Sequence, residues 1–149
     1  CKDSIYGVLS DPERCPMARQ HAISPAPAVA VKDLSGPALK AFFRIAELWK
    51  LDTREQQILL GSPAPSTFFK WKKELAGSLS RDVLERISYV LGIYKALQIL
   101  FNDSRNADEW ISRPNTATPF GGESALQRML GGNVSDLYVV RQYLDAQRG

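Results

Sequence analysis

The sequence is poor in the residues that bind metals. It has a single histidine, His21, and two cysteines, Cys1 and Cys15, both near its N-terminal end. Zinc sites need several Cys or His ligands at characteristic spacings, so we expect no metal site. A disulfide between the cysteines would staple only a peripheral segment, and we interpret them as free thiols. Apolar runs of about eighteen residues and a signal-peptide pattern are lacking too, so we expect a cytoplasmic protein.

Groups suited to catalysis are equally scarce. His21 has no acid or nucleophile near it in the sequence, and Asp108 and Glu109 are adjacent, so on a helix they point in different directions and do not form an acid/base pair. The chain has neither a Walker motif nor a dinucleotide-binding glycine motif. We therefore expect no catalytic residues and no cofactor, and we predict that the protein is not an enzyme.

The net charge of +3 is small, but it is unevenly distributed. Residues 36–79 contain seven basic and four acidic side chains, whereas residues 102–149 contain five basic and six acidic ones. A local basic excess of this kind is typical of a DNA-binding module. On charge alone, a solvated basic face explains it equally well.

Proline and alanine dominate residues 1–36, which we interpret as an N-terminal arm or linker. Helical spacing starts at Pro37, a residue suited to the first position of a helix. From there one apolar stripe follows, made of Leu39, Phe42, Phe43, Ala46 and Trp49. The pattern predicts an all-α fold.

A helix-turn-helix is predicted next. Thr53 and Gln56 have capping-box spacing, Gly61 ends that short helix, and Ser66 is a suitable N-cap for the following one. On this third helix Phe68, Trp71 and Leu75 share one face, and the opposite face is polar and basic. That outer face gives the candidate DNA-binding residues, which are Ser66, Thr67, Phe69, Lys70 and Lys73. The alternative is a generic three-helix bundle with a wet basic side.

A long helix follows Ser80, its predicted N-cap, with Asp82 in the first turn. Its first half is amphipathic, but near its end apolar residues surround the helix, from Ile93 to Phe101. Such a helix packs against more than one element. It is either the central helix of a compact bundle or part of a homodimer interface, and the pattern does not choose between them.

The final third predicts three more helices. The first is a short one around 107–111 that ends before Pro114, and the second covers 123–130, after a loop over 115–122. Asn133 is the predicted cap of the last helix. That helix has three apolar rows, one with Leu137, one with Tyr143 and one with Tyr138, where a core-facing helix needs only one. The excess predicts a contact surface.

Several of these segments together resemble the Xre/MbcA/ParS antitoxin family, which joins an Xre-like helix-turn-helix to a C-terminal toxin-binding domain. The resemblance rests on "LSRDVLERISYVLGIYKALQILF", on Trp110, Ile111, Pro114 and Asn115, on the "FGG" that ends at Gly122, and on "MLGGNVSDLYVVRQYLDAQRG". It implies a helix-turn-helix helical bundle over 37–98 followed by a small helical toxin-binding domain over 99–149.

The resemblance also implies a function. The protein would be the antitoxin of a type II toxin–antitoxin system and would cover the NAD pocket of a RES-domain toxin, which degrades NAD or transfers ADP-ribose. It would repress its own operon by binding operator DNA. We also expect a homodimer within the toxin–antitoxin complex, because paired half-sites in DNA favour paired proteins. Trp110, Pro114, Asn115, Gly121 and Gly122 would shape the toxin-binding domain. The residues expected to face the toxin are Tyr138, Arg141, Gln142, Asp145, Gln147, Arg148 and Gly149.

The residue types fit such a surface. Tyrosine and arginine are enriched at interface hot spots, and arginine pairs with carboxylates through two hydrogen bonds. An acidic group such as Asp145, or the chain terminus, would occupy the hydrogen-bond donors with which the toxin's NAD pocket otherwise binds pyrophosphate. The alternative function is a stand-alone helix-turn-helix repressor whose C-terminal domain mediates dimerisation.

Overall fold

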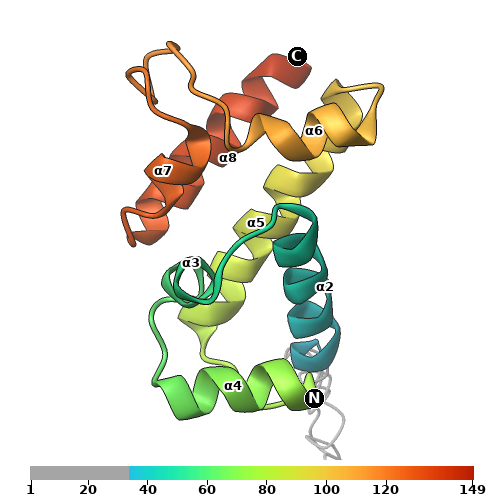
Figure 1. The fold of residues 1–149 in the computed structure, drawn as a ribbon, viewed down its shortest axis with the longest axis vertical. Helices are drawn as coiled ribbons and strands as arrows, with labels where there is room; N and C mark the ends of the chain where they lie inside the picture. The colour runs from blue at the N-terminus through green and yellow to red at the C-terminus, as the bar shows by residue number, and fades with distance from the viewer. Residues whose placement is uncertain (1–33) are drawn as a thin grey trace, which may run out of the picture. The chain divides into compact units, whose positions relative to one another are not determined.

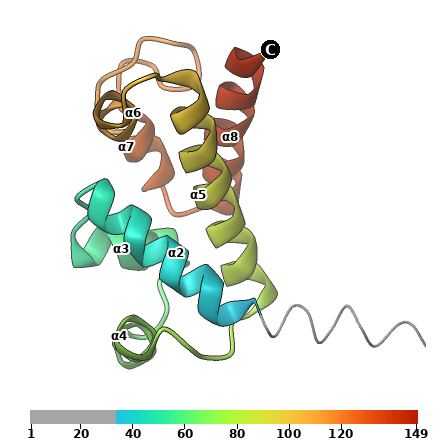
Figure 2. The same ribbon diagram turned by 90° about the vertical axis from the view of Figure 1, so that its right-hand side faces the viewer.

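The structure is a computed structural model that describes residues 34–149. Over this range the chain forms α-helices and no β-strand. The helix α5 (Arg81–Leu100) is the long central element (Figure 1). Helices α2, α3 and α4 gather around its first half, and α6, α7 and α8 around its second half (Figures 1 and 2). The all-α prediction is confirmed, whereas Cys1, Cys15, His21 and most of the predicted arm lie outside the described residues.

Helix α2 (Ser35–Leu48) begins two residues before the predicted start, so Pro37 occupies its third position. Its buried face is made of Ser35, Leu39, Phe42, Ile45 and Ala46. Phe43, which the spacing placed in the stripe, is only half-buried, because it lies at the edge that faces α4. The α2 helix packs mainly against α5.

Helices α3 (Thr53–Leu59) and α4 (Pro65–Glu74) form the predicted helix-turn-helix, but both caps differ from the prediction. Asp52, not Thr53, caps α3: its Oδ1 accepts from the Glu55 backbone N–H at 2.8 Å, and the Glu55 carboxylate accepts from the Asp52 N–H at 2.8 Å. The α4 helix starts one residue before Ser66, with Pro65 at its first position, where a missing N–H costs nothing.

The cap of α5 is the predicted one, since the Ser80 hydroxyl accepts from the Val83 N–H at 3.2 Å. Six residues spread along the whole helix are buried, namely Val83, Ile87, Val90, Ile93, Ala96 and Leu97. Helices α6 and α8 contact α5, and Trp49, at the end of α2, lies against Tyr94 with 6.4 Å between ring centroids, which explains why apolar side chains surround the second half of α5. Ile99 remains 53% exposed.

The last three helices are α6 (Ser104–Trp110), α7 (Ala125–Met129) and α8 (Val134–Arg148). The α6 helix starts three residues before the predicted 107, because the Asp103 side chain caps it. The α7 helix is shorter than the predicted 123–130, because Ser124 is its N-cap and accepts from the Gln127 N–H. Asn133 occupies the predicted N-cap position of α8, but its side chain accepts no capping hydrogen bond and instead donates to Asp136.

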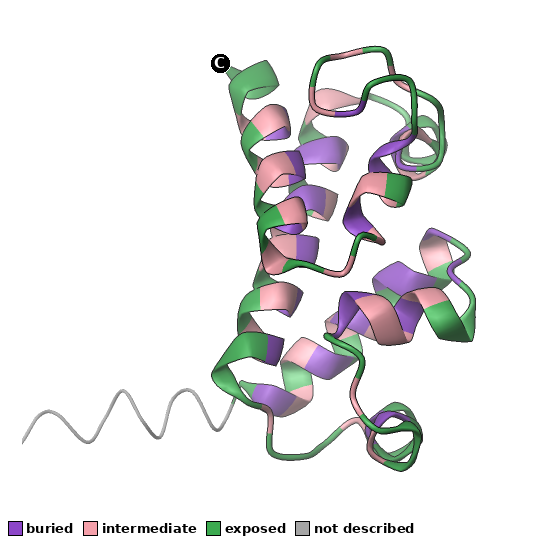
Figure 3. Cartoon of the chain, turned by 90° about the vertical axis from the view of Figure 1, so that its left-hand side faces the viewer, coloured by how far each residue is buried: buried purple, intermediate pink, exposed green. Residues whose placement is uncertain are grey.

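The apolar row that begins at Leu137 and continues with Val140 and Leu144 is buried against α5 and α7. The opposite side of α8 stays exposed or half-exposed, as the colours along this helix show in Figure 3. Among the described helices none is long and apolar enough to cross a membrane.

Candidate functional site

The outer face of α4 carries the residues predicted to contact DNA. Phe69 is 52% exposed, and Ser66, Lys70 and Lys73 are exposed as well. Thr67 is half-buried, at the boundary between this face and the core. The structure therefore brings four of the five candidates together on one accessible side of the second helix of the helix-turn-helix.

The inner face of α4 holds the helix rigidly. Phe68 is fully buried, and its ring meets that of Phe43 edge-to-face with 5.8 Å between centroids. Trp71 packs closely against the backbone of Gly77, where an added Cβ would lie 2.7 Å from the indole ring. Fixed packing of this kind keeps an outer face in one orientation, which groove recognition requires.

Trp110, predicted to shape the toxin-binding domain, lies within an aromatic cluster. Its ring stacks on that of Tyr143 with 6.3 Å between centroids and 15° between planes. Phe120 meets both rings edge-to-face, at 6.0 Å from Trp110 and 5.0 Å from Tyr143. The cluster joins α6, the following loop and α8. It borders a small cavity of about 250 Å³ that Gln147 also lines.

Pro114 and Asn115 lie in that loop. Pro114 forms an isolated antiparallel bridge with Ser124, and the Asn115 N–H donates to the Glu123 carbonyl at 3.1 Å. The Asn115 side-chain oxygen accepts from the Ala117 N–H at 2.9 Å, and its carbonyl accepts from the Gly122 N–H at 2.9 Å. These contacts are internal, so the loop residues give the domain its shape.

Three predicted toxin-facing residues lie together on the outer side of α8. Tyr138 is 46% exposed, and its hydroxyl accepts from the Gln142 side chain at 2.9 Å. The Tyr138 ring also meets that of Tyr89 on α5 edge-to-face, with 6.0 Å between centroids. Arg141 lies beside them, and its Nε is 2.9 Å from Asp145 Oδ2. We call Tyr89, Tyr138, Arg141, Gln142 and Asp145 the α5–α8 surface.

Asp145 sits between two arginines. Its Oδ2 accepts from Arg141, while Oδ1 lies 3.5 Å from Arg148 Nη1 without hydrogen-bond geometry. This carboxylate is thus paired within α8, but its side chain, at 40% exposed, is as accessible as those of Arg141 (33%) and Arg148 (37%), so all three charged groups are presented near the end of the helix. Gln147 and Gly149 are exposed beside them.

Gly92 on α5 was not singled out by the sequence, although an isolated glycine inside a helix often marks a close contact. A Cβ at this position would lie 1.6 Å from Arg141 Nη1 and 2.5 Å from Arg141 Cζ. The missing side chain therefore leaves the space in which the Arg141 guanidinium rests against α5. Tyr89 belongs to the α5–α8 surface, and Gly92 lies against its Arg141, only because α5 and α8 pack side by side.

Domain models of two kinds match the chain. The Antitoxin Xre-like helix-turn-helix domain matches residues 28–92, and the Antitoxin Xre/MbcA/ParS C-terminal toxin-binding domain matches residues 96–149. A relative, "Uncharacterized protein y4oB" of Sinorhizobium fredii (strain NBRC 101917 / NGR234), is 59% identical over 111 residues, which are 74% of this chain and 84% of that protein. The chain belongs to the Xre/MbcA/ParS antitoxin family.

As a member of this antitoxin family, the chain has a DNA-binding part and a toxin-binding part. The first match covers α2, α3, α4 and α5 as far as Gly92, and the second covers the last five residues of α5 with α6, α7 and α8. The α4 face and the α5–α8 surface thus belong mainly to different halves of the antitoxin.

Arg86 links the two halves of the antitoxin, a contact that no pattern in the sequence indicated. The side chain is 11% exposed, pairs with Asp82 at 2.9 Å and donates to the Gly132 carbonyl, in the turn before α8, at 3.1 Å. At Gly61, which ends α3 with φ +91°, an added Cβ would lie 3.0 Å from Arg86 Nε. One guanidinium therefore contacts the helix-turn-helix and the α7–α8 turn.

Asp108 makes a further link within the toxin-binding part. Burial raises the pKa of its carboxyl, and a hydrogen bond from Gln98 partly opposes this by lowering the pKa. The Gln98 Nε2 donates to Asp108 Oδ1 at 3.0 Å and so connects α5 to α6. Glu109 points elsewhere and pairs with Arg113 at 2.7 Å. The two neighbouring carboxylates thus have separate structural contacts.

Proposed function

We propose that the protein neutralises a RES-domain, NAD-consuming toxin by covering its NAD pocket with the α5–α8 surface and the end of α8. We further propose that it represses its own operon through α4, acts as a homodimer in the cytoplasm and has no catalytic activity of its own. The match of residues 96–149 to a toxin-binding domain carries the proposal. The exposed tyrosine and paired arginines of α8 support it, because such side chains dominate interface energetics.

The geometry suggests which groups of α8 would meet a toxin. Tyr138 offers a rigid ring already held by Tyr89 and Gln142, so little conformational entropy is lost when a partner covers it. Arg141 and Arg148 flank Asp145 and are available for carboxylates of the partner. Inhibition would then be occlusion of a pocket, not chemistry.

Co-expression with a RES-domain toxin tests this function. We expect the full chain to restore growth and cellular NAD and to co-purify with the toxin. Replacing Arg141 by alanine should weaken the complex by about tenfold or more, since the loss of a hydrogen-bonded interface arginine costs over 1 kcal/mol. Arg113→Ala is the matched control, because Arg113, which follows α6, is also held by a carboxylate four residues away, that of Glu109 on α6.

The results separate the proposed antitoxin from a stand-alone repressor. A repressor would leave NAD loss unabated and would purify without the toxin. If Arg113→Ala weakened the complex as much as Arg141→Ala, the α5–α8 surface would not be the contact.

Gly92→Ala offers a sharper test of the same surface. Alanine is the better helix former by about 1 kcal/mol, and only the flexible end of Arg141 must move to admit the new methyl group. We expect the free energy of unfolding to stay within about 1 kcal/mol of the parent value. Toxin affinity should fall several-fold, because the new methyl group displaces the Arg141 guanidinium from its position against α5. Ser88→Ala, a change at an exposed position one turn earlier on α5, is the control. If Gly92→Ala left the toxin affinity unchanged, Arg141 would not be a toxin contact.

A further inference from the structure

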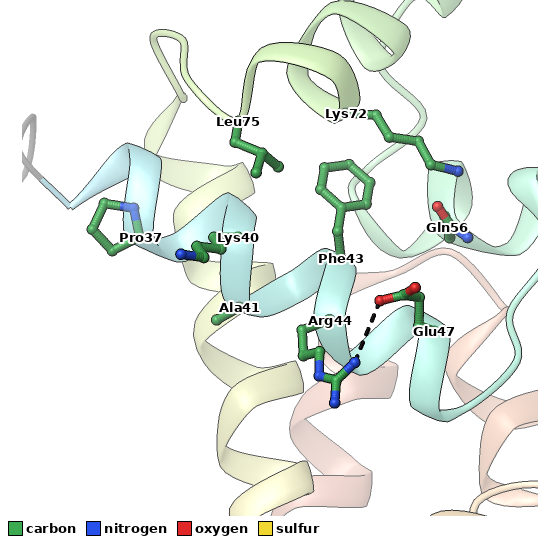
Figure 4. A pocket seen from close by; sticks show the side chains of 9 residues that line it. All are labelled: Pro37, Lys40, Ala41, Phe43, Arg44, Glu47, Gln56, Lys72 and Leu75. Atoms are coloured by element: carbon green, nitrogen blue, oxygen red, sulfur yellow. Dashed lines mark ion pairs between the residues drawn. The ribbon is translucent and has the colours of Figure 1, made fainter.

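A groove in the DNA-binding half is separate from both surfaces described above. It has a volume of about 890 Å³ and lies between α2 and α4, with α3 at one end (Figure 4). Its lining residues are Pro37, Lys40, Ala41, Phe43, Arg44, Glu47, Gln56, Lys72 and Leu75. We call it the α2–α4 groove. Lys70 and Lys73, on the outer face of α4, do not line it.

The charges of the groove favour an acidic ligand. Lys40, Arg44 and Lys72 contribute three positive charges, and Glu47 contributes the single negative one. Glu47 lies 3.7 Å from Arg44, but both side chains are mostly exposed, so water screens this pair and it holds neither group firmly. The remaining positive potential would attract carboxylates or phosphates.

The uncharged part of the groove indicates whether carboxylates or phosphates are the better ligands. Phe43 and Leu75 form an apolar wall, with Ala41 and Pro37 beyond it (Figure 4). A peptide offers apolar side chains for such a wall, whereas the sugar–phosphate backbone of DNA offers ionic and polar groups and no apolar anchor. The combination of wall and cations therefore favours a peptide over nucleic acid.

Gln56 adds an acceptor at the α3 end. The residue is 7% exposed, and its Nε2 donates to the Leu51 carbonyl at 2.8 Å. Its Oε1 accepts no hydrogen bond from any residue in the described part of the chain. The carboxamide and the Lys72 side chain point toward one another across this end (Figure 4). A peptide N–H can satisfy such an acceptor once a carboxylate draws Lys72 aside, but a phosphate diester has no donor to offer.

We propose that the α2–α4 groove binds a short acidic segment of a partner protein. An apolar side chain of the segment packs on Phe43 and Leu75, and carboxylates on either side pair with Lys40 and Arg44. This is a second protein-binding site, distinct from the α5–α8 surface, and it places a partner beside the helix that contacts DNA.

The test uses the full chain and two fluorescent peptides of about 12 residues, a length typical of such recognition. One peptide alternates Asp and Glu with two leucines, and the other has serines in place of the leucines. At about 0.15 M salt, fluorescence anisotropy should show at least roughly fivefold tighter binding of the leucine peptide. Lys40→Glu with Arg44→Glu should weaken that binding by roughly tenfold or more. Lys95→Glu with Arg105→Glu, an equal change of charge at exposed positions, should not.

Three outcomes would overturn the proposal. Equal affinity for both peptides would mean that only charge is recognised. If duplex DNA displaced the peptide, and if Lys40→Glu with Arg44→Glu weakened peptide binding and DNA binding equally, the groove would be a phosphate site. If the parent protein self-associated and the Lys40→Glu, Arg44→Glu variant did not, the occupant of the groove would be a second copy of the chain. Toxin neutralisation by the groove variant should remain intact, so failure here is distinguishable from failure of the proposed function.

Discussion

Replacing Lys70 and Lys73 together by alanine is expected to weaken operator binding by roughly thirtyfold at about 0.15 M salt. Each phosphate contact releases about 0.9 counterions, which is worth roughly fivefold in affinity at this salt relative to 1 M. The two lysines are exposed on the outer face of α4 and point away from the core. The slope of log affinity against log salt should therefore become shallower by about 1.8, as measured by fluorescence anisotropy with operator DNA.

The control for this prediction is the pair Lys95→Ala with Arg113→Ala. These two exposed cations lie on α5 and three residues after α6, and their loss changes the net charge by the same amount. Their operator affinity and salt slope should match those of the parent. If both double variants behaved alike, the effect would be one of net charge, and α4 would not be the helix in contact with DNA.

Phe68→Ala is expected to lower the free energy of unfolding by about 3–5 kcal/mol, the usual cost of removing a fully buried phenylalanine ring. Phe68 is 0% exposed and meets Phe43 edge-to-face, so its loss opens a cavity between α4 and α2. Chemical denaturation followed by circular dichroism measures the change. Operator binding should fall with it, because α4 is no longer held in one orientation.

Phe69→Ala provides the matched comparison, one residue along the same helix. Its ring is 52% exposed and touches Phe68 edge-to-face at 5.2 Å, so we expect a loss below about 1 kcal/mol. Operator binding should nevertheless weaken if the exposed ring contacts DNA. Equal destabilisation by the two substitutions would mean that α4 is not packed through the Phe68 face.

Apolar spacing predicted the helices well, but it did not determine their caps. Asp52-x-x-Glu55 and Thr53-x-x-Gln56 are both valid capping boxes, one residue apart, and the sequence offers no local reason to prefer the first. Likewise Ser66 is a suitable N-cap, yet Pro65 takes the first helical position before it. Local propensities are nearly equal for two helix starts that are one residue apart, and the packing of the whole helix determines which start is used.

The candidate contacts were harder to predict, because they depend on residues far apart in the sequence. Trp110 was expected to shape the toxin-binding domain, but its stacking on Tyr143 requires α6 and α8 to meet. Asp145 remains a predicted toxin contact, and its ion pair with Arg141 is local to one turn of helix. The role of Gly92 depends on a contact with α8 that helical periodicity does not contain.

The unbroken course of α5 has a geometric consequence. Because α5 begins within the helix-turn-helix match and ends within the toxin-binding match, the number of its residues sets the angle between the two halves. Each residue inserted between the two halves would rotate everything after it by about 100° and advance it by about 1.5 Å. An insertion of one residue would turn the α8 side of the molecule away from its present direction relative to the outer face of α4. Seven would nearly restore that direction, about 10 Å further along the helix, so changes of length are tolerable only in near-whole turns.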